Sequence, residues 1–166
     1  DAVVAPSALQ RLLHAACDTS FNAISVDGDT STNDALIALA SGATGCGVES
    51  PEAWRVFSAA VTEVLTTLAR AVAADGEGAT RLLEVEVRGT RDDATARAIA
   101  RTVCRSSLFK SSVFAGDPAW GRLAAAVGQA CLERPGHDAL EATQATQVPF
   151  DAAALRIEAQ GILVYE

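Results

Sequence analysis

Acidic side chains gather in one polar segment of the chain, Asp27-Gly-Asp-Thr-Ser-Thr-Asn-Asp34. The carboxylates of Asp27 and Asp29 are two residues apart. Such a pair can bind a hard cation, or can act as nucleophile and acid in phosphoryl transfer. The competing interpretation is a structural turn whose side chains cap the helix that follows.

The Asp-x-Asp turn after a predicted strand resembles the first motif of the haloacid-dehalogenase phosphatases. The other residues of such a site would have to be Lys110 and the pair Asp92-Asp93. Asp92-Asp93 fits better as the cap of a helix. The sequence therefore favours the structural turn over the phosphatase.

Glu77 lies between two glycines, in Asp75-Gly-Glu-Gly-Ala-Thr80, just after a long predicted helix. Glycines let the backbone approach a ligand closely, and a single carboxylate presented there suits an ammonium group. A helix-terminating turn with a solvated acid is the alternative. The residues alone leave both interpretations open.

A third segment, Asp117-Pro-Ala-Trp-Gly-Arg122, pairs Trp120 and Arg122 at a predicted helix start. Asp117 fits a helix cap and Trp120 fits a packed residue. The planar guanidinium of Arg122 could pair with a buried acid or a substrate carboxylate. We favour the structural role for this segment. His14 and His137 show no pattern of a catalytic triad.

Composition and charge restrict the class of partner. The chain has 166 residues, 49% of them hydrophobic, and a net charge of -8 without a basic cluster. These features argue against a nucleic-acid or anionic-membrane partner. We find no signal peptide and no apolar stretch of about 20 residues, as a membrane span needs. The four cysteines form no CxxC pair and are predicted to be buried free thiols in a reducing cytoplasm.

Apolar spacing and capping residues predict the helices. One runs from Pro6 to near Asp18, and a long one starts at Ser50-Pro51-Glu52 and ends at Gly76. Two more begin at Asp92-Asp93 and at Asp117, with Pro118 in the first turn. The apolar segment Ala35 to Ala40 is predicted to be helical as well.

Alternating and apolar runs predict the strands. They are Phe21 to Val26, Leu83 to Arg88 with one wet face, Leu108 to Phe114, and a closing hairpin of Leu155 to Ala159 with Ile162 to Tyr165. Residues 131–150 are predicted to be an exposed loop. The fold class is α/β, or α+β, in layers, without a dinucleotide-binding fingerprint.

Taken together, the three segments resemble one family, the ornithine acetyltransferases, which are bifunctional glutamate N-acetyltransferases. The resemblance covers Asp1 through about Gly128, in the order and spacing of that family. It implies that residues 1–166 are a single β-chain portion of an αβ enzyme. The implied fold is an amino-terminal-nucleophile type acyltransferase related to the aminopeptidase DmpA superfamily.

The resemblance also implies a mechanism. A precursor cleaves itself before a threonine, and the freed amine acts as base for that threonine's hydroxyl. The threonine takes an acetyl group from N-acetylornithine, releases ornithine, and passes the acetyl group to glutamate. It is expected about eight residues upstream of Asp1, so this chain holds no catalytic residue. No cofactor and no metal are implied, and the α chain from the same precursor would supply the oxyanion hole in a heterotetramer of two α and two β chains.

Glu77 is the substrate-binding residue that carries over, and it would hold an amino group of ornithine. Three features depart from the family. One is the loop from Cys131 to Phe150, which is longer and more polar than expected. Ala119 stands where the family generally has asparagine, and the chain ends at Glu166 without the family's tail. Alternatives are therefore a relative that acts as an amidase or aminopeptidase, a relative with another acyl acceptor, and a non-catalytic scaffold domain.

Overall fold

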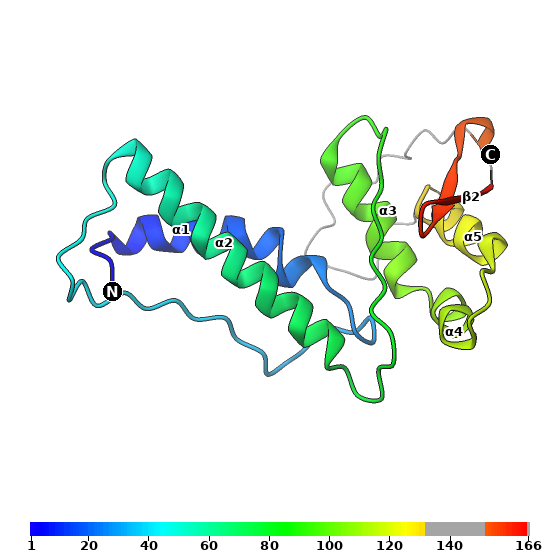
Figure 1. The fold of residues 1–166 in the computed structure, drawn as a ribbon, viewed down its shortest axis with the longest axis horizontal. Helices are drawn as coiled ribbons and strands as arrows, with labels where there is room; N and C mark the ends of the chain where they lie inside the picture. Colours follow the sequence, from blue (N-terminus) through cyan, green and yellow to red (C-terminus); the bar gives the residue numbers. More distant parts are fainter. Residues whose placement is uncertain (132–151, 166) are drawn as a thin grey trace. The chain divides into compact units, whose positions relative to one another are not determined.

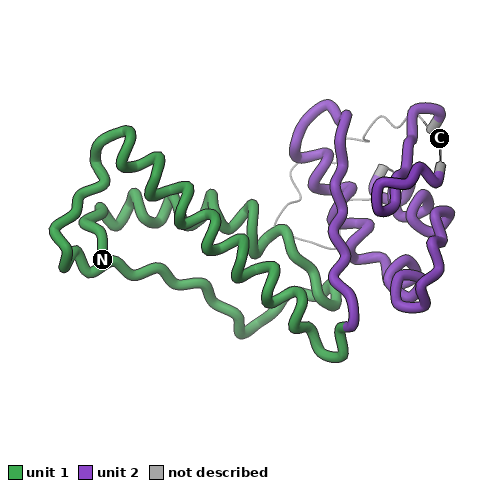
Figure 2. Tube along the Cα trace, viewed as in Figure 1, with its two compact units in different colours: residues 1–79 green, residues 80–166 purple. Residues whose placement is uncertain are grey.

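The computed structural model describes residues 1–131 and 152–165 of the chain. The chain divides into two compact units, residues 1–79 and residues 80–166 (Figure 2). Each unit has its own helices and its own buried residues, so each is described by itself.

Two helices that pack against one another form the frame of the first unit (Figure 1). They are α1 (Pro6–Asp18) and α2 (Pro51–Ala74), and both were predicted from the sequence. Their buried residues are Leu12 and Ala16 on α1 and Leu65 and Ala69 on α2. The spacing of four places each pair on one face of its helix.

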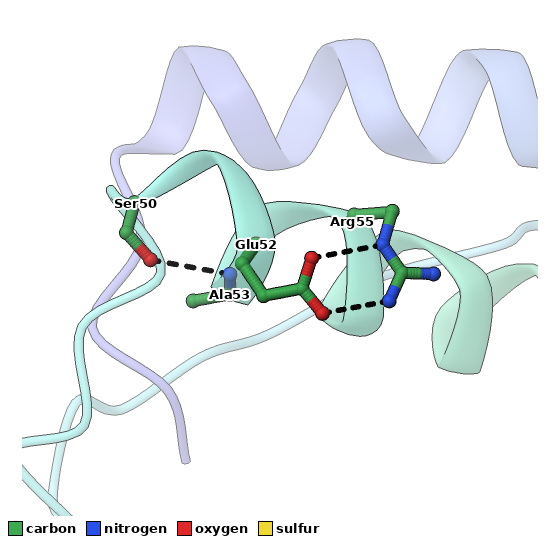
Figure 3. A network of polar contacts seen from close by, with 4 residues as sticks. All are labelled: Ser50, Glu52, Ala53 and Arg55. Carbon is green, nitrogen blue, oxygen red and sulfur yellow. Dashed lines mark hydrogen bonds and ion pairs between the residues drawn. The ribbon is translucent and has the colours of Figure 1, made fainter.

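Local signals define the start of α2, as the sequence predicts (Figure 3). The hydroxyl of Ser50 accepts a hydrogen bond of 3.2 Å from the backbone N–H of Ala53. One turn on, Arg55 donates to both carboxylate oxygens of Glu52, at 2.7 and 3.0 Å. This hydrogen bond from Arg55 lowers the pKa of Glu52 below its ordinary value.

Two predictions between α1 and α2 are wrong. The predicted strand at Phe21 to Val26 is instead η1 (Phe21–Ala23), a short 3-10 helix followed by irregular chain. The backbone N–H of Ala23 bonds the carbonyl of Ser20 at 3.0 Å, so a local turn satisfies groups that a strand would leave to a partner.

The predicted helix from Ala35 to Ala40 is also absent, and the segment is extended. Exposure there alternates, with Leu36 and Ala38 half-buried and Ile37 and Leu39 exposed. Six residues are too few to offset the cost of starting a helix without strong packing.

The first residues of the chain lie beside the segment that leads into α2. The N–H of Val3 donates to the carbonyl of Cys46 at 2.8 Å, and Val3 forms a parallel bridge with Gly47. The hydroxyl of Thr44 donates to the carbonyl of Asp1 at 2.8 Å. The segment from Asp1 to Val3 therefore runs parallel to the segment from Thr44 to Gly47.

By length and composition alone, α2 could cross a membrane, which the sequence analysis had not expected of any segment. The helix carries Glu63 and Arg70 within its apolar stretch. Its buried side packs against α1. A helix of a packed helical pair satisfies the same test, so the finding is weak evidence for a membrane span.

Three helices form the frame of the second unit: α3 (Asp93–Arg105), α4 (Ser107–Ala115) and α5 (Trp120–Cys131). α3 packs against α5, and α4 contacts both. Buried Val103, Phe109 and Ala126, one from each helix, form a cluster. Asp92 caps α3 by accepting a hydrogen bond of 2.8 Å from the N–H of Thr95, as predicted.

The predicted strand from Leu83 to Arg88 is extended and has the expected alternation. Leu83, Val85 and Val87 are half-buried against the helices of this unit, and the residues between them are exposed. Among the described residues no neighbouring strand pairs with it. The sequence predicted its two faces correctly, whereas the ladder of hydrogen bonds is missing.

The predicted strand from Leu108 to Phe114 is wrong, because these residues form α4. The hydroxyl of Ser106 caps the helix by accepting from the N–H of Phe109 at 3.2 Å, and Gly116 ends it at a φ of 75°. Phe109, Ser112 and Val113 point to one side at helical spacing, against α3 and α5.

The closing hairpin is confirmed. β1 (Ile157–Ala159) pairs antiparallel with β2 (Ile162–Tyr165), after the short helix η2 (Ala152–Ala154). Gln160 and Gly161 both have positive φ, at 52° and 78°, which is typical of a type I′ turn. The chain therefore has the mixed helix and strand content expected of it. The predicted loop at 131–150 lies, except for Cys131, outside the described residues.

Candidate functional site

Glu77 lies at the centre of a tight turn directly after α2. The N–H of Asp75 makes the last bond of the helix, to the carbonyl of Ala71 at 3.0 Å. The N–H of Ala79 then bonds the carbonyl of Gly76 at 2.8 Å and closes a four-residue turn. Glu77 and Gly78 are its two central residues, and Glu77 is exposed. The turn presents one carboxylate to solvent at the end of a long helix.

The two glycines beside Glu77 are required for different physical reasons. Gly78 has a φ of 73°, in the left-handed region, which is typical of the third residue of a type II turn. Gly76 is close to another segment, because a Cβ built on it would lie 3.0 Å from Cγ1 of Val26. One glycine therefore permits the turn, and the other permits a contact.

The contact at Gly76 brings two of the three sequence segments together. Val26 directly precedes the acidic segment that begins at Asp27, and Gly76 directly precedes Glu77. The turn at Asp27 and the turn at Glu77 are therefore neighbours at one end of the first unit (Figure 1). Val26 was not predicted to belong to a functional site. Its only signal in the sequence is that it is an apolar residue directly before a polar turn.

The carboxylate of Asp27 is used within its own turn. Its Oδ1 accepts from the N–H of Asp29 at 2.8 Å. Further on, the hydroxyl of Ser31 accepts from the N–H groups of Asn33 and Asp34, at 3.2 and 3.1 Å. The structural interpretation of the segment is thus correct, although no helix follows for it to cap.

The residues that a phosphatase site would need are divided between the two units. Asp92 is the cap of α3, and Lys110 lies on α4, in the other unit from Asp27 and Asp29. Within residues 1–131 and 152–165, no group of three or more His, Cys, Asp or Glu side chains could hold a metal ion.

The third segment, from Asp117 to Arg122, precedes and begins α5. The helix starts at Trp120, so Pro118 lies before it and not in its first turn. Asp117 closes a turn by accepting from the N–H of Ala119 at 3.0 Å, where a helix cap was expected. Ala119 itself has a positive φ of 27°. Trp120 is 45% exposed, so the prediction that it packs is only partly met.

Arg122 connects α5 to α4. Its Nη1 donates to the hydroxyl of Ser112 at 2.6 Å and to the carbonyl of Leu108 at 3.2 Å. Ser112 is 1% exposed, so this guanidinium satisfies a buried hydroxyl. The structural role favoured for the segment is the one observed.

The remaining reactive side chains form no second site. Cys17, Cys46 and Cys104 are free thiols, as predicted, but none of the three is fully buried: Cys17 and Cys104 are half-buried and Cys46 is exposed. Burial raises the pKa of Cys104, which keeps it protonated and unreactive. His14 is exposed on α1, and His137 lies outside the described residues.

An open hollow of about 530 Å³ lies along residues 58–67 of α2 and contains one charged group, Glu63. Glu77 lies fourteen positions after Glu63 in the chain. The hollow is therefore not part of the turn that presents Glu77.

Comparison with known sequences gives a match over nearly the whole chain. The model of the ArgJ family matches residues 1–165. A protein of Synechococcus sp. named arginine biosynthesis bifunctional protein ArgJ is 54% identical over 135 residues, which are 80% of this chain and 32% of that protein. The protein of the same name from Thermosynechococcus vestitus is 47% identical over 164 residues, 98% of this chain and 35% of that protein. The chain thus spans about a third of the length of these relatives.

Comparison with solved structures points to the same kind of protein as the sequence comparison. The crystal structure of the arginine biosynthesis bifunctional protein from Bacillus halodurans superposes with a TM-score of 0.75 at 40% sequence identity. The match covers 78% of this chain and 62% of that chain.

Proposed function

Because the chain belongs to the ArgJ family, we propose that it is the carboxyl-terminal (β) portion of an enzyme of arginine biosynthesis. The enzyme is a glutamate N-acetyltransferase that moves an acetyl group from N-acetylornithine to glutamate. The observation that carries the proposal is the family match over residues 1–165, which include all three sequence segments. The names of the relatives supply the pathway.

The chemistry proceeds through an acyl-enzyme. The hydroxyl of a threonine upstream of Asp1 attacks the acetyl carbonyl of N-acetylornithine, while the threonine's own α-amine takes the proton. The amide C–N bond breaks, and ornithine leaves with a proton from that amine. The amine of glutamate then attacks the acetyl ester and restores the threonine. Two successive transfers of this kind give ping-pong kinetics.

Glu77 binds the donor through its free amino group. N-acetylornithine has one free amino group, because the other carries the acetyl group. This ammonium meets a carboxylate that the turn after α2 exposes, between Gly76 and Gly78. Glutamate has no side-chain ammonium, so Glu77 distinguishes the donor from the acceptor.

The rest of the protein completes the site. The proposal includes an α chain from the same precursor that supplies the oxyanion hole, and an assembly of two α and two β chains. It also includes a fold of the amino-terminal-nucleophile type related to the aminopeptidase DmpA superfamily, and a location in the cytoplasm. The chain spans only about a third of its curated relatives, which leaves room for such an α chain.

The proposal is tested on the full-length, self-processed protein. We expect transfer of acetyl from N-acetylornithine to glutamate, together with an adduct of about 42 Da, one acetyl group, on the threonine-led chain. Mass spectrometry of the enzyme with donor alone shows the adduct. Addition of glutamate should remove it.

Two other results would contradict the proposal in different ways. An adduct that water removes as fast as glutamate does would make the enzyme an amidase. A correctly cleaved protein without transfer or adduct would have another acyl substrate, or would be a scaffold.

A further inference from the structure

Val26 packs against the first residue of the turn that presents Glu77. After the last bond of α2, a backbone hydrogen bond from the N–H of Ala79 to the carbonyl of Gly76 closes the turn. The packing contact comes from Val26, whose Cγ1 would lie 3.0 Å from a Cβ at Gly76. A side chain that packs against Gly76 limits the positions that the turn can take, and Glu77 is the next residue along the chain.

Val26 is suited to this role by its shape. A β-branched side chain has one strongly preferred χ1 rotamer, so its methyl group is a stiff support. The site facing it is tight, since the Cβ of Ala79 and the carbonyl of Ala73 also lie within 3.7 Å of the same built Cβ. Glycine at position 76 is what lets the valine approach the backbone.

We infer that Val26 is a positioning residue for Glu77, and that the packing of Val26 on Gly76 orients the carboxylate toward the donor's ammonium group. The inference rests on the proposed function of Glu77 and adds a residue to that site. Val26 itself touches no substrate. It is 48% exposed, so its contribution to stability is small and its effect is expected in binding.

The test uses three variants of the full-length, self-processed enzyme: Val26→Ala, Gly76→Ala, and the two combined. We expect each single variant to raise the KM for N-acetylornithine about fivefold, because a misplaced carboxylate binds the donor less well. The kcat, the KM for glutamate and the melting temperature should stay unchanged. In the combined variant the new methyl group at position 76 replaces those lost at position 26, so the KM for the donor should return toward its original value.

Val56→Ala is the matched control, since Val56 is 53% exposed and lies near the start of α2, far along the chain from Glu77. It removes the same methyl groups and should leave both KM values unaltered. In a Glu77→Gln background, Val26→Ala should have no further effect on the KM for the donor.

The outcomes separate this inference from the proposed function. If Glu77→Gln raises the KM for the donor and Val26→Ala leaves it unchanged, Val26 has no positioning role and the role of Glu77 stands. If Glu77→Gln leaves that KM unchanged, the proposed role of Glu77 is wrong and the role of Val26 falls with it. An equal rise in both KM values for Val26→Ala would show a general structural defect and overturn the inference.

Discussion

Ala119 is a non-glycine residue with a positive φ, at 27°, just before α5. The left-handed region brings the Cβ of an L-residue close to its own carbonyl and costs about 1–2 kcal/mol. Asparagine tolerates this region better than alanine does. Ala119 is therefore a strained residue.

Ala119→Asn is expected to raise the free energy of unfolding by about 0.5–1 kcal/mol. Equilibrium unfolding in urea measures the change. The control is Ala125→Asn at an exposed position inside α5, which should lower stability, because asparagine is a poorer helix former than alanine. A loss of stability in both variants would contradict strain at Ala119.

The charge of Glu77 is expected to contribute to binding of the donor. Glu77→Gln should raise the KM for N-acetylornithine about tenfold, the equivalent of roughly 1.4 kcal/mol, because it removes the charge that meets the ammonium group. The effect is modest because this carboxylate is exposed. Self-cleavage should continue, which is checked by the size of the chains on a gel.

Glu63→Gln is the matched control for that measurement. Glu63 is also an exposed acid of the first unit, on α2. An unaltered KM for the donor in Glu77→Gln, or an equal rise in Glu63→Gln, would remove Glu77 from the site.

At the scale of elements, side-chain caps determine where the helices start. Ser50, Asp92 and Ser106 each accept a hydrogen bond from an N–H in the first turn of α2, α3 and α4. Each bond satisfies one of the donors that a helix end leaves without a partner. The cap of α3 is the charged one.

The charged cap makes the stability of α3 dependent on pH. The hydrogen bond from the N–H of Thr95 lowers the pKa of Asp92, with a smaller contribution from Arg91. A carboxyl group with a lowered pKa in the folded state stabilises fully above its ordinary pKa of about 3.9. That stabilisation is lost as the pH falls through the lower folded-state value.

Asp92→Asn should therefore flatten this part of the pH profile, because an asparagine side chain caps a helix at every pH. The charge of Asp92 adds to the stability that the helix cap itself provides. We therefore expect the two proteins to differ less in melting temperature at pH 3 than at pH 5. Circular dichroism melts of both proteins at a series of pH values provide the comparison. Parallel profiles would show that the charge of Asp92 does not contribute to stability.

At the scale of the whole molecule, large apolar side chains are left exposed in both units. Ile37 is 75% and Leu39 91% exposed in the first unit, and Phe114 is 68% and Ile162 67% exposed in the second. Exposed apolar side chains of this kind are available for contact with another polypeptide. The proposed α chain would cover them in the mature enzyme.

The 166-residue chain alone should therefore bind the dye anilinonaphthalene sulfonate, with an increase in fluorescence. The protein co-expressed with its amino-terminal portion should bind much less. Dye fluorescence at equal concentrations of the two preparations is the measurement. Equal fluorescence would show that the α chain does not cover these side chains.

The sequence by itself determined the features that depend on near neighbours in the chain. α1, α2 and α3 start where a proline or a capping side chain predicts, and the hairpin turn has the residues its positive φ angles favour. The alternation of Leu83 to Arg88 gave its two faces correctly. The glycines around Glu77 predicted a turn that presents a carboxylate.

Only the tertiary structure decided the features that depend on distant residues. The run from Leu108 to Phe114 is apolar enough for a strand or a helix, and packing against α3 and α5 makes it α4. The contact of Val26 with Gly76 joins residues fifty positions apart, so no local pattern indicates it. Local bonding is encoded within one turn of chain, whereas the neighbours of a side chain across the fold depend on how the elements pack.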